Sequence, residues 1–331
     1  MSKLGVARRL LMSPPKGVPE PGRAPSYIWA RRCGANPLFE LACSAARTHP
    51  TMLAYRHAFH AGNHADVLKH VVLCAVLRHM NAKPKPYRLV DSHAGAGGYS
   101  LQGDHARKKR EFEQGIARLM ERDDAPPPVA DYLSLVRQFN PNGKLEQYPG
   151  SPALAQFLLR PIDQHRLFEM HPTEHRILAA YLADARNAEV MDTDGFDGLK
   201  SQVPPSMRRG VVLMDPSYEG RADYARVHAA LREALTRFAE GVYLVWYPQV
   251  SKLEAAQLPK RLIALAPKGW LHASLTVQPS NQPGFGLNGS GIVVINPPHT
   301  LHAQLQGVLP YLTQVLGQYA GAHHLLEHRP A

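Results

Sequence analysis

The stretch GVVLMDPSYEG, residues 210–220, places a carboxylate, a proline and an aromatic ring directly after an apolar run. The run predicts a buried strand that ends at Asp215. A carboxylate there can accept a hydrogen bond from an amino group, and the carbonyl of Pro216 can accept a second one. The ring of Tyr218 can stack on a flat base. The pattern suits either an ordinary strand exit or a site that holds an amino-bearing ring.

Three further acids follow predicted strands, namely Asp91, Glu169 and Asp194. One such acid is typical of a loop or a helix N-cap, but packing of the core does not require four acids at four strand ends. Glycines in DSHAGAGG, residues 91–98, let the backbone turn tightly and approach a ligand. In this setting Glu169 can accept hydrogen bonds from a ribose diol, and Asp194 from an exocyclic amine.

The elements that position these acids alternate along the chain. Strands are predicted at 165–172, 188–196, 210–218, 241–248 and 290–298, with a first strand at 87–99 that breaks into the glycine-rich loop, and helices at 65–80, 173–185 and 224–239. Strands separated by helices of this length predict an α/β, Rossmann-like fold, with a mostly parallel sheet and helices on both faces. The acids then share the carboxyl edge of the sheet, where ligands bind.

One interval, about 100–150, is too long for a simple crossover. We interpret it as a small helical insertion, with helices over 105–124 and 129–139 joined by APPP. A second Asn-Pro-Pro, in NPPH at 296–299, follows the strand expected to close the sheet. We interpret it as a structural turn.

Composition narrows the class of protein. A net charge of +11 and a pI of about 9.6 favour a polyanionic partner such as nucleic acid. The longest apolar run, VVLCAVL, is too short to span a bilayer, so we expect a soluble protein that does not bind a membrane. Three cysteines without a CxxC pair predict neither a disulfide framework nor a thiolate zinc site, and favour the cytoplasm. The histidines of residues 57–70 lack a standard ligand spacing, so no metal is expected.

The first 51 residues differ from the rest. Residues 1–51 hold eight Lys/Arg, two Asp/Glu and seven prolines, with no apolar period. Such a composition predicts a disordered extension, or a start placed too far upstream; a targeting segment is the alternative. Met52 would then open the folded domain, residues 52–331.

Several motifs together resemble the bacterial 23S ribosomal RNA adenine-N6 methyltransferase J family. They are MLAYRHAFHAGNHADVLKH (52–70), DSHAGAG, YPGSP, LFEMHP, DGF, DPSYE, LVWYP and SGIVVINPP. The resemblance covers residues 52 to about 325. It implies a Rossmann-like S-adenosylmethionine-dependent methyltransferase fold, S-adenosyl-L-methionine as the cofactor, and an adenine N6 amine of 23S ribosomal RNA as the methyl acceptor. We expect a cytoplasmic monomer.

The resemblance also assigns roles to residues. Cofactor contacts fall on His70, His93, Ser151, Glu169, Asp194 and Gly195; catalysis on Asp215, Pro216 and Tyr218; and RNA contacts on Tyr55, Arg56, His57 and Lys69. Ser217 departs from the family, which has a second proline there, and this weakens the rigidity of the turn.

Two rival functions are open. A DNA amino-methyltransferase would use the same chemistry, but the sequence shows no separate target-recognition domain. A non-catalytic nucleic-acid-binding or uptake protein could use the same fold, but every group that the reaction needs is present.

Overall fold

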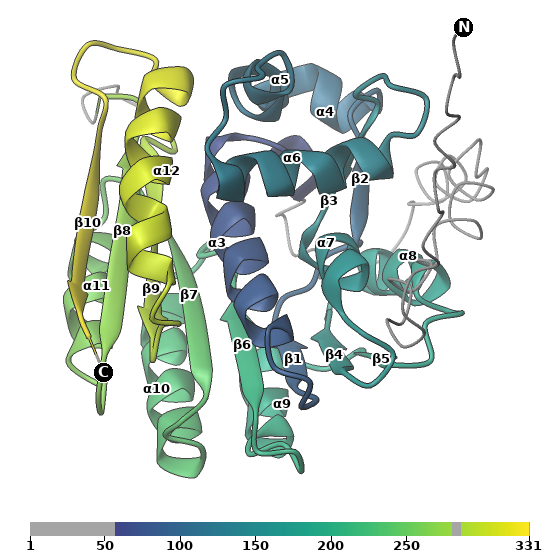
Figure 1. The fold of residues 1–331 in the computed structure, drawn as a ribbon, viewed down its shortest axis with the longest axis vertical. Coiled ribbons are helices and arrows are strands. Elements are labelled where there is room, and N and C mark those ends of the chain that lie inside the picture. The colour runs from purple at the N-terminus through teal and green to yellow at the C-terminus, as the bar shows by residue number, and fades with distance from the viewer. Residues whose placement is uncertain (1–56, 280–285, 331) are drawn as a thin grey trace, which may run out of the picture. The chain divides into compact units, whose positions relative to one another are not determined.

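The computed structural model describes residues 57–279 and 286–330, which lie within one compact unit. The predicted extension 1–51 and the predicted RNA contacts Tyr55 and Arg56 fall outside the described residues. The main sheet contains β1 (Arg88–Asp91), β4 (Gln164–Phe168), β5 (Ala188–Met191), β6 (Gly210–Met214), β7 (Val242–Gln249), β8 (Trp270–Thr276), β9 (Gly289–Ile295) and β10 (His323–Arg329). Figure 1 shows these strands side by side, in the order β10-β8-β9-β7-β6-β1-β4-β5.

The sheet is mostly parallel, as predicted. Strands β5, β4, β1, β6 and β7 pair in parallel, whereas β9 is antiparallel to both β7 and β8, and β10 is antiparallel to β8. The prediction that β9 closes the sheet is wrong, because β9 lies between β7 and β8. Strands β8 and β10 were not predicted from the sequence. Strand β10 is largely exposed, so its sequence, HHLLEHR, has no buried apolar face to signal a strand.

Helices cover both faces of the sheet (Figure 1). On one face lie α3 (His64–Asn81), α7 (Ser151–Leu158) and α12 (Leu301–Leu316); on the other lie α9 (Gly195–Gln202), α10 (Arg221–Arg237) and α11 (Leu253–Ile263). The remaining crossover helix, α8 (Pro172–Tyr181), packs against β5. Burial on two faces explains why β6 is apolar throughout and why both β6 and β9 are fully buried.

Between β1 and β4 the chain leaves the sheet. This segment holds a two-stranded ladder, β2 (Gly98–Ser100) and β3 (Gln147–Pro149), together with α4 (Asp104–Lys109), the 3-10 helix η2 (Glu111–Gln114), α5 (Ile116–Met120) and α6 (Pro127–Phe139). The single helix expected over 105–124 is wrong, because Arg110 takes a positive φ of 52° and the chain breaks again at Gly115. A Cβ at Gly115 would lie 2.1 Å from the Gly62 carbonyl oxygen, so this break lets the insertion pack beside the start of α3.

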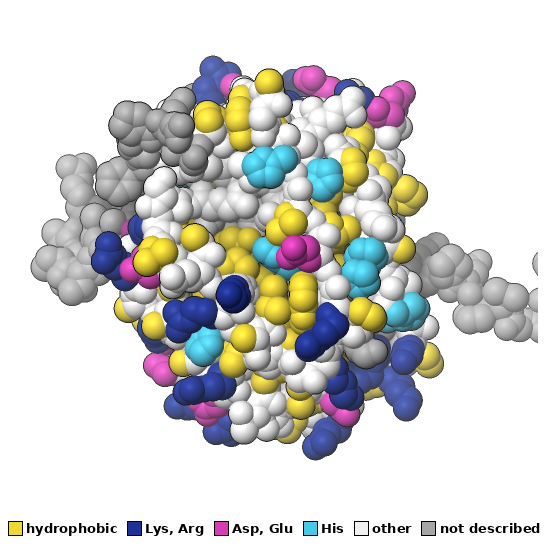
Figure 2. Space-filling view, turned by 90° about the vertical axis from the view of Figure 1, so that its left-hand side faces the viewer, with side chains coloured by type: hydrophobic (Ala, Val, Ile, Leu, Met, Phe, Trp, Pro, Cys, Tyr) yellow, Lys and Arg dark blue, Asp and Glu magenta, His cyan; other side chains and the backbone are white. Residues whose placement is uncertain are grey.

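Strand β10 forms one edge of the sheet, and Figure 2 looks at that side of the molecule. Basic side chains, in dark blue, gather over the lower part of this face, and histidines, in cyan, over its upper and right-hand parts. Leu325 of β10 is 38% exposed. None of the helices in the described part of the chain combines the length and apolar character needed to cross a membrane.

Asn140, at the end of α6, connects this helix to the start of β3 through hydrogen bonds of its side chain. These bonds allow a test of the stability of the protein. Its side-chain nitrogen donates to the carbonyls of Val136 and Gln147, both at 2.9 Å, while its oxygen accepts the backbone N–H groups of Glu146 and Gln147. Asn140→Ala would leave these buried groups without partners, which costs about 1–3 kcal/mol. We expect a lower urea midpoint, followed by far-ultraviolet circular dichroism, and no change for the exposed control Asn142→Ala. Equal midpoints for the two variants would contradict this account.

Candidate active site

The four acids lie along one edge of the sheet. Asp91 ends β1, Glu169 and Asp215 directly follow β4 and β6, and Asp194 follows β5 as the N-cap of α9. Strands β6, β1, β4 and β5 are neighbours in the sheet, and their parallel pairing puts all four carboxyl ends at the same side. The juxtaposition predicted from the sequence is therefore present.

The loop after β1 is hydrogen-bonded to Glu169. Gly95 and Gly97 take positive φ angles of 65° and 85°, a region that favours glycine. One carboxylate oxygen of Glu169 accepts the N–H of Gly95 at 2.8 Å, and the other accepts the N–H of His171 at 2.7 Å. Burial raises the pKa of Glu169, although both N–H groups act against this shift. The carboxylate is thus held at the edge of the glycine loop.

Asp91, the last residue of β1, is 1% exposed. The hydroxyl of Ser151 donates to it at 2.6 Å, and the N–H of His93 at 3.3 Å. Burial raises the pKa of Asp91 to about 6, even though the Ser151 hydrogen bond opposes the rise. Ser151, predicted to contact a cofactor, is here a hydrogen-bond partner of Asp91. The family resemblance gave Asp91 no role, and only its position at a strand end signals one.

Aromatic and charged groups form the adjoining wall. The rings of His93 and Phe196 meet edge to face at 4.6 Å, and burial lowers the pKa of His93 to about 4, so its imidazole is neutral. Asp194 accepts the N–H of Phe196 at 2.9 Å and pairs with Arg226 at 2.8 Å. Burial alone would raise the pKa of Asp194, but the hydrogen bond and charge of Arg226 lower it. Asp194 is therefore ionised.

Gly195 brings this wall against the loop after β1. A Cβ at Gly195 would lie 1.7 Å from the carbonyl oxygen of Ser92, far inside contact distance. The start of α9 can approach the end of β1 only because residue 195 has no side chain. The structure explains in this way why a glycine follows Asp194, independently of any ligand.

A buried ion cluster lies beside Asp215. The ammonium of Lys69, on α3, pairs with Asp215 and, at 2.8 Å, with Asp66. Asp66 also accepts hydrogen bonds from His57 at 2.9 Å and from the N–H of Gly62 at 3.0 Å. Burial raises the pKa of Asp215, and Lys69 opposes that rise. Burial would lower the pKa of Lys69, but its two carboxylates outweigh burial and raise it.

Lys69 and His70, predicted to contact the RNA and the cofactor, are both buried. Lys69 is 4% exposed, and both of its partners are acids of this chain. His70 is fully buried, and its Nδ1 forms a 2.7 Å hydrogen bond with the hydroxyl of Tyr148. In this structure Lys69 acts on Asp215, and His70 packs below the site. His57, in contrast, keeps 20% of its side chain exposed.

The turn DPSY is bent at Tyr218, which has a positive φ of 52°. The ring of Tyr218 is only 3% exposed and lies 4.7 Å from that of Tyr224. Its hydroxyl donates to the backbone carbonyl of Trp246 at 2.6 Å. The predicted stacking of Tyr218 on a base therefore has no open ring face in this structure, and Tyr218 supports β7 instead. The sequence analysis gave Trp246 no role.

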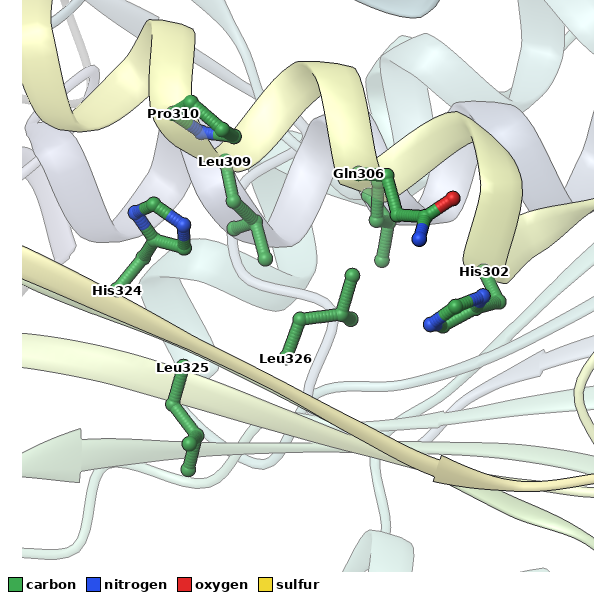
Figure 3. Close-up of a pocket in the computed structure, with 8 residues that line it drawn as sticks. His302, Gln306, Leu309, Pro310, His324, Leu325 and Leu326 are labelled. Carbon is green, nitrogen blue, oxygen red and sulfur yellow. The ribbon is translucent and has the colours of Figure 1, made fainter.

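The pocket in Figure 3 lies elsewhere. It lies between α12 and β10, encloses about 320 Å³, and is lined by residues such as His302, Gln306, Leu309, His324 and Leu326. It contains none of the strand-end acids, so it is separate from the candidate active site. Within residues 57–279 and 286–330, no group of three or more His, Cys, Asp or Glu side chains could hold a metal ion.

The fold and the site define a class of protein. Apart from the edge strand β10, the sheet is parallel except for one antiparallel strand, β9, which is inserted between β7 and β8. This is the topology of Rossmann-like methyltransferases. The glycine loop after β1 and the acids after β4, β5 and β6 lie where such enzymes bind their ligands.

Comparisons with known proteins support the assignment to the methyltransferases. The family model described as "Ribosomal RNA large subunit methyltransferase D, RlmJ" matches residues 84–327. The chain is 42% identical over 261 residues to Ribosomal RNA large subunit methyltransferase J of Escherichia coli (strain K12), covering 79% of this chain and 93% of that protein. It is also 42% identical over 266 residues to the Haemophilus influenzae protein of the same name, covering 80% and 94%. A crystal structure of a Legionella pneumophila protein matches with a TM-score of 0.75 and 33% identity, covering 81% of this chain and 98% of that one.

The chain therefore belongs to the family of large-subunit ribosomal RNA methyltransferases J, and the resemblance seen in the sequence is confirmed.

The Lys69–Asp215 pair predicts a change in pH dependence. Lys69→Met removes the cation that opposes the effect of burial, so the pKa of Asp215 rises further. If Asp215 must be ionised, activity is lost as the pH falls through this pKa, and the loss should begin at a higher pH in the variant. Rates of methyl transfer between pH 5 and 9 test this, with the exposed Lys200→Met as the control. An unshifted acidic limb would remove Lys69 from this role.

Proposed function

We propose that this chain transfers a methyl group from S-adenosylmethionine to the exocyclic N6 amine of an adenine in 23S ribosomal RNA. The observation that carries the proposal is Asp215 directly after β6, with 13% of its side chain exposed, ion-paired with Lys69 and on the same edge as the glycine loop. Family membership supports the reaction and the class of RNA.

The residues of the edge fit the cofactor. A Cβ at Gly95 would lie 2.1 Å from the Tyr99 hydroxyl, so the loop stays free of side chains where a nucleoside would approach. Glu169 offers acceptors to a ribose diol, and Asp194 to the adenine amine. The neutral ring of His93 supplies an apolar surface. Buried Asp91 would offer a carboxylate to the positively charged methionyl part. The cofactor itself supplies an activated methyl group on a sulfonium.

Asp215 acts on the methyl acceptor. An aryl amine is a weak nucleophile, because its lone pair is delocalised into the ring. An ionised Asp215 accepts one N–H of the amine, and the carbonyl of Pro216 accepts the other, which localises the lone pair for attack. The hydrogen bonds from Lys69 orient the carboxylate. The protein thus contributes positioning and polarisation.

The substrate RNA would reach this site with its base unstacked, since the amine of a paired and stacked base is not accessible to Asp215. His57 is partly exposed beside the ion cluster, and the ammonium of Lys252 donates to the Tyr218 carbonyl at 3.3 Å. Both can contact the nucleotide or its phosphate, and Tyr55 and Arg56 stay predicted contacts. We further propose a cytoplasmic monomer.

Glu169 should act on cofactor binding. Glu169→Ala removes a charged acceptor, and a hydrogen bond to a charged group contributes roughly 1.5–3 kcal/mol. Cofactor affinity should therefore fall about ten- to a hundredfold in isothermal titration calorimetry with S-adenosylhomocysteine. Asp192→Ala, an exposed acid near the end of β5, is the matched control and should bind normally. An unchanged dissociation constant for Glu169→Ala would exclude it from the cofactor site.

Asp215 should act on the reaction while sparing the cofactor. Asp215→Ala should slow single-turnover methylation of unmethylated 23S ribosomal RNA by about a hundredfold or more, the scale seen when one polarising hydrogen bond is removed. Its affinity for S-adenosylhomocysteine should stay within a few-fold of the wild type. Duplex DNA, as the second substrate, tests the DNA methyltransferase alternative. Transfer to RNA at the wild-type rate would rule out the proposed role of Asp215.

A further inference from the structure

Trp246 is the neighbour of Asp215 across two parallel strands. Met214 of β6 lies opposite Val245 of β7, so the next residues along these strands are Asp215 and Trp246. Both therefore lie at the carboxyl edge, where the acids gather. Trp246 is half-buried.

Trp246 and Asp215 also share a partner. The ammonium of Lys69, which pairs with Asp215, lies 6.0 Å from the centroid of the Trp246 ring. An indole at this distance attracts a cation. The indole and the carboxylate thus lie near one buried charge.

The backbone of Trp246 is held from the other side. The Tyr218 hydroxyl donates to the Trp246 carbonyl at 2.6 Å, and the two ring centroids lie 6.0 Å apart. The turn that contains Asp215 therefore also holds the backbone of Trp246 through this hydrogen bond. This arrangement limits the freedom of the indole.

The indole nitrogen has no hydrogen-bond partner among the described residues. Nε1 of Trp246 is buried and finds no acceptor in the described part of the chain. Indole N–H groups usually find a partner when they are buried, and a donor left without one is costly. An unused donor beside the acid of the active site is therefore a feature that a ligand can satisfy.

Adenine presents the matching group. Its N6 amine is flanked by N1, a hydrogen-bond acceptor, and N7 lies on the other side of the same edge. We propose that the Trp246 indole N–H donates to a ring nitrogen beside the target amine, so that Trp246 determines specificity for the base. This inference rests on the proposed function and names how the same site recognises adenine.

Asp215 would then bind the N6 amine of adenine, a donor, and Trp246 would bind the neighbouring ring nitrogen, an acceptor. In guanine the ring position next to the exocyclic amine at C2 is N1, which carries a hydrogen, so an indole N–H would meet a second donor there on one side. A carbonyl replaces the amine at C6. A guanine bound in the pose of adenine would place its C6 carbonyl against the Asp215 carboxylate and, if N1 is the acceptor, its N1–H against the indole N–H, so it is rejected.

The test combines one protein change with two changes of the base. After the methylated adenosine has been mapped in wild-type reactions, RNA fragments carry adenosine, 1-deazaadenosine or 7-deazaadenosine at that position. Single-turnover rates are measured with the wild type, Trp246→Phe and the control Trp270→Phe, a change at the start of β8. Phenylalanine keeps an aromatic ring but lacks the N–H donor and is smaller than the indole, so the comparison with the deaza analogues isolates the contribution of the donor.

We expect Trp246→Phe to react with adenosine about three- to tenfold more slowly, the range for one neutral hydrogen bond. The wild type should lose a similar factor on one deaza analogue, and Trp246→Phe should lose nothing further on that analogue. The identity of that analogue assigns the acceptor as N1 or N7. Affinity for S-adenosylhomocysteine should be unchanged, and Trp270→Phe should behave like the wild type.

Independent losses from the protein and base changes would overturn the inference while leaving the proposed function intact. A wild type that reacts equally with all three RNAs would overturn it as well, whether or not Trp246→Phe folds. A wild type that methylates none of the RNA substrates would instead overturn the proposed function, and the inference with it.

Discussion

The site depends on one buried charge, the ammonium of Lys69. Taking an ammonium and two carboxylates out of water is costly, and the cost is offset only if each charge has a close partner. Asp215 and Asp66 meet this requirement from β6 and from α3 itself. The pairing fixes the start of α3 over the carboxyl edge of the sheet. It also opposes the rise in the pKa of Asp215 that burial causes, and so favours the ionised state, in which the carboxylate can accept an amine hydrogen.

Residues that fit the cofactor and residues that fit the methyl acceptor lie on different strands along one edge of the sheet. Strands β1, β4 and β5 carry the glycine loop and the acids that fit a nucleoside cofactor, whereas β6 and β7 carry Asp215 and Trp246. Because β1 lies directly beside β6, the two groups of residues are neighbours. A methyl donor and a methyl acceptor can then meet above the boundary between β1 and β6. Positioning of this kind is the main contribution that a protein makes when the cofactor already carries an activated group.

The aromatic residues of the site differ in role from what the motif alone indicates. A tyrosine two residues after Pro216 suggests a stacking platform, but Tyr218 is buried and bonded to the Trp246 carbonyl. The aromatic side chain beside Asp215 is therefore Trp246, presented by the next strand. Ser217 in place of a second proline leaves the Tyr218 bend, with its φ of 52°, in position. The bend is thus maintained by contacts on both sides of Tyr218 and does not require a proline at residue 217.

The sequence by itself determined the parallel sheet, the position of its carboxyl edge and the four acids on it, because continuous apolar runs and the acids that end them are local signals. It also indicated the family, since motifs such as DPSYE and DSHAGAG are contiguous. Strand β10 was not predicted, because the edge strand HHLLEHR lacks a buried face. The buried strand β8, WLHASLT, was not predicted either. The roles of Lys69 and Trp246 were decided only by the tertiary structure. Lys69 is 146 residues from Asp215 in the chain, and a basic side chain looks the same in sequence whether it faces RNA or a buried carboxylate. Only the packing of α3 on β7 and β9 removes it from water and places it close to both the acid and the indole.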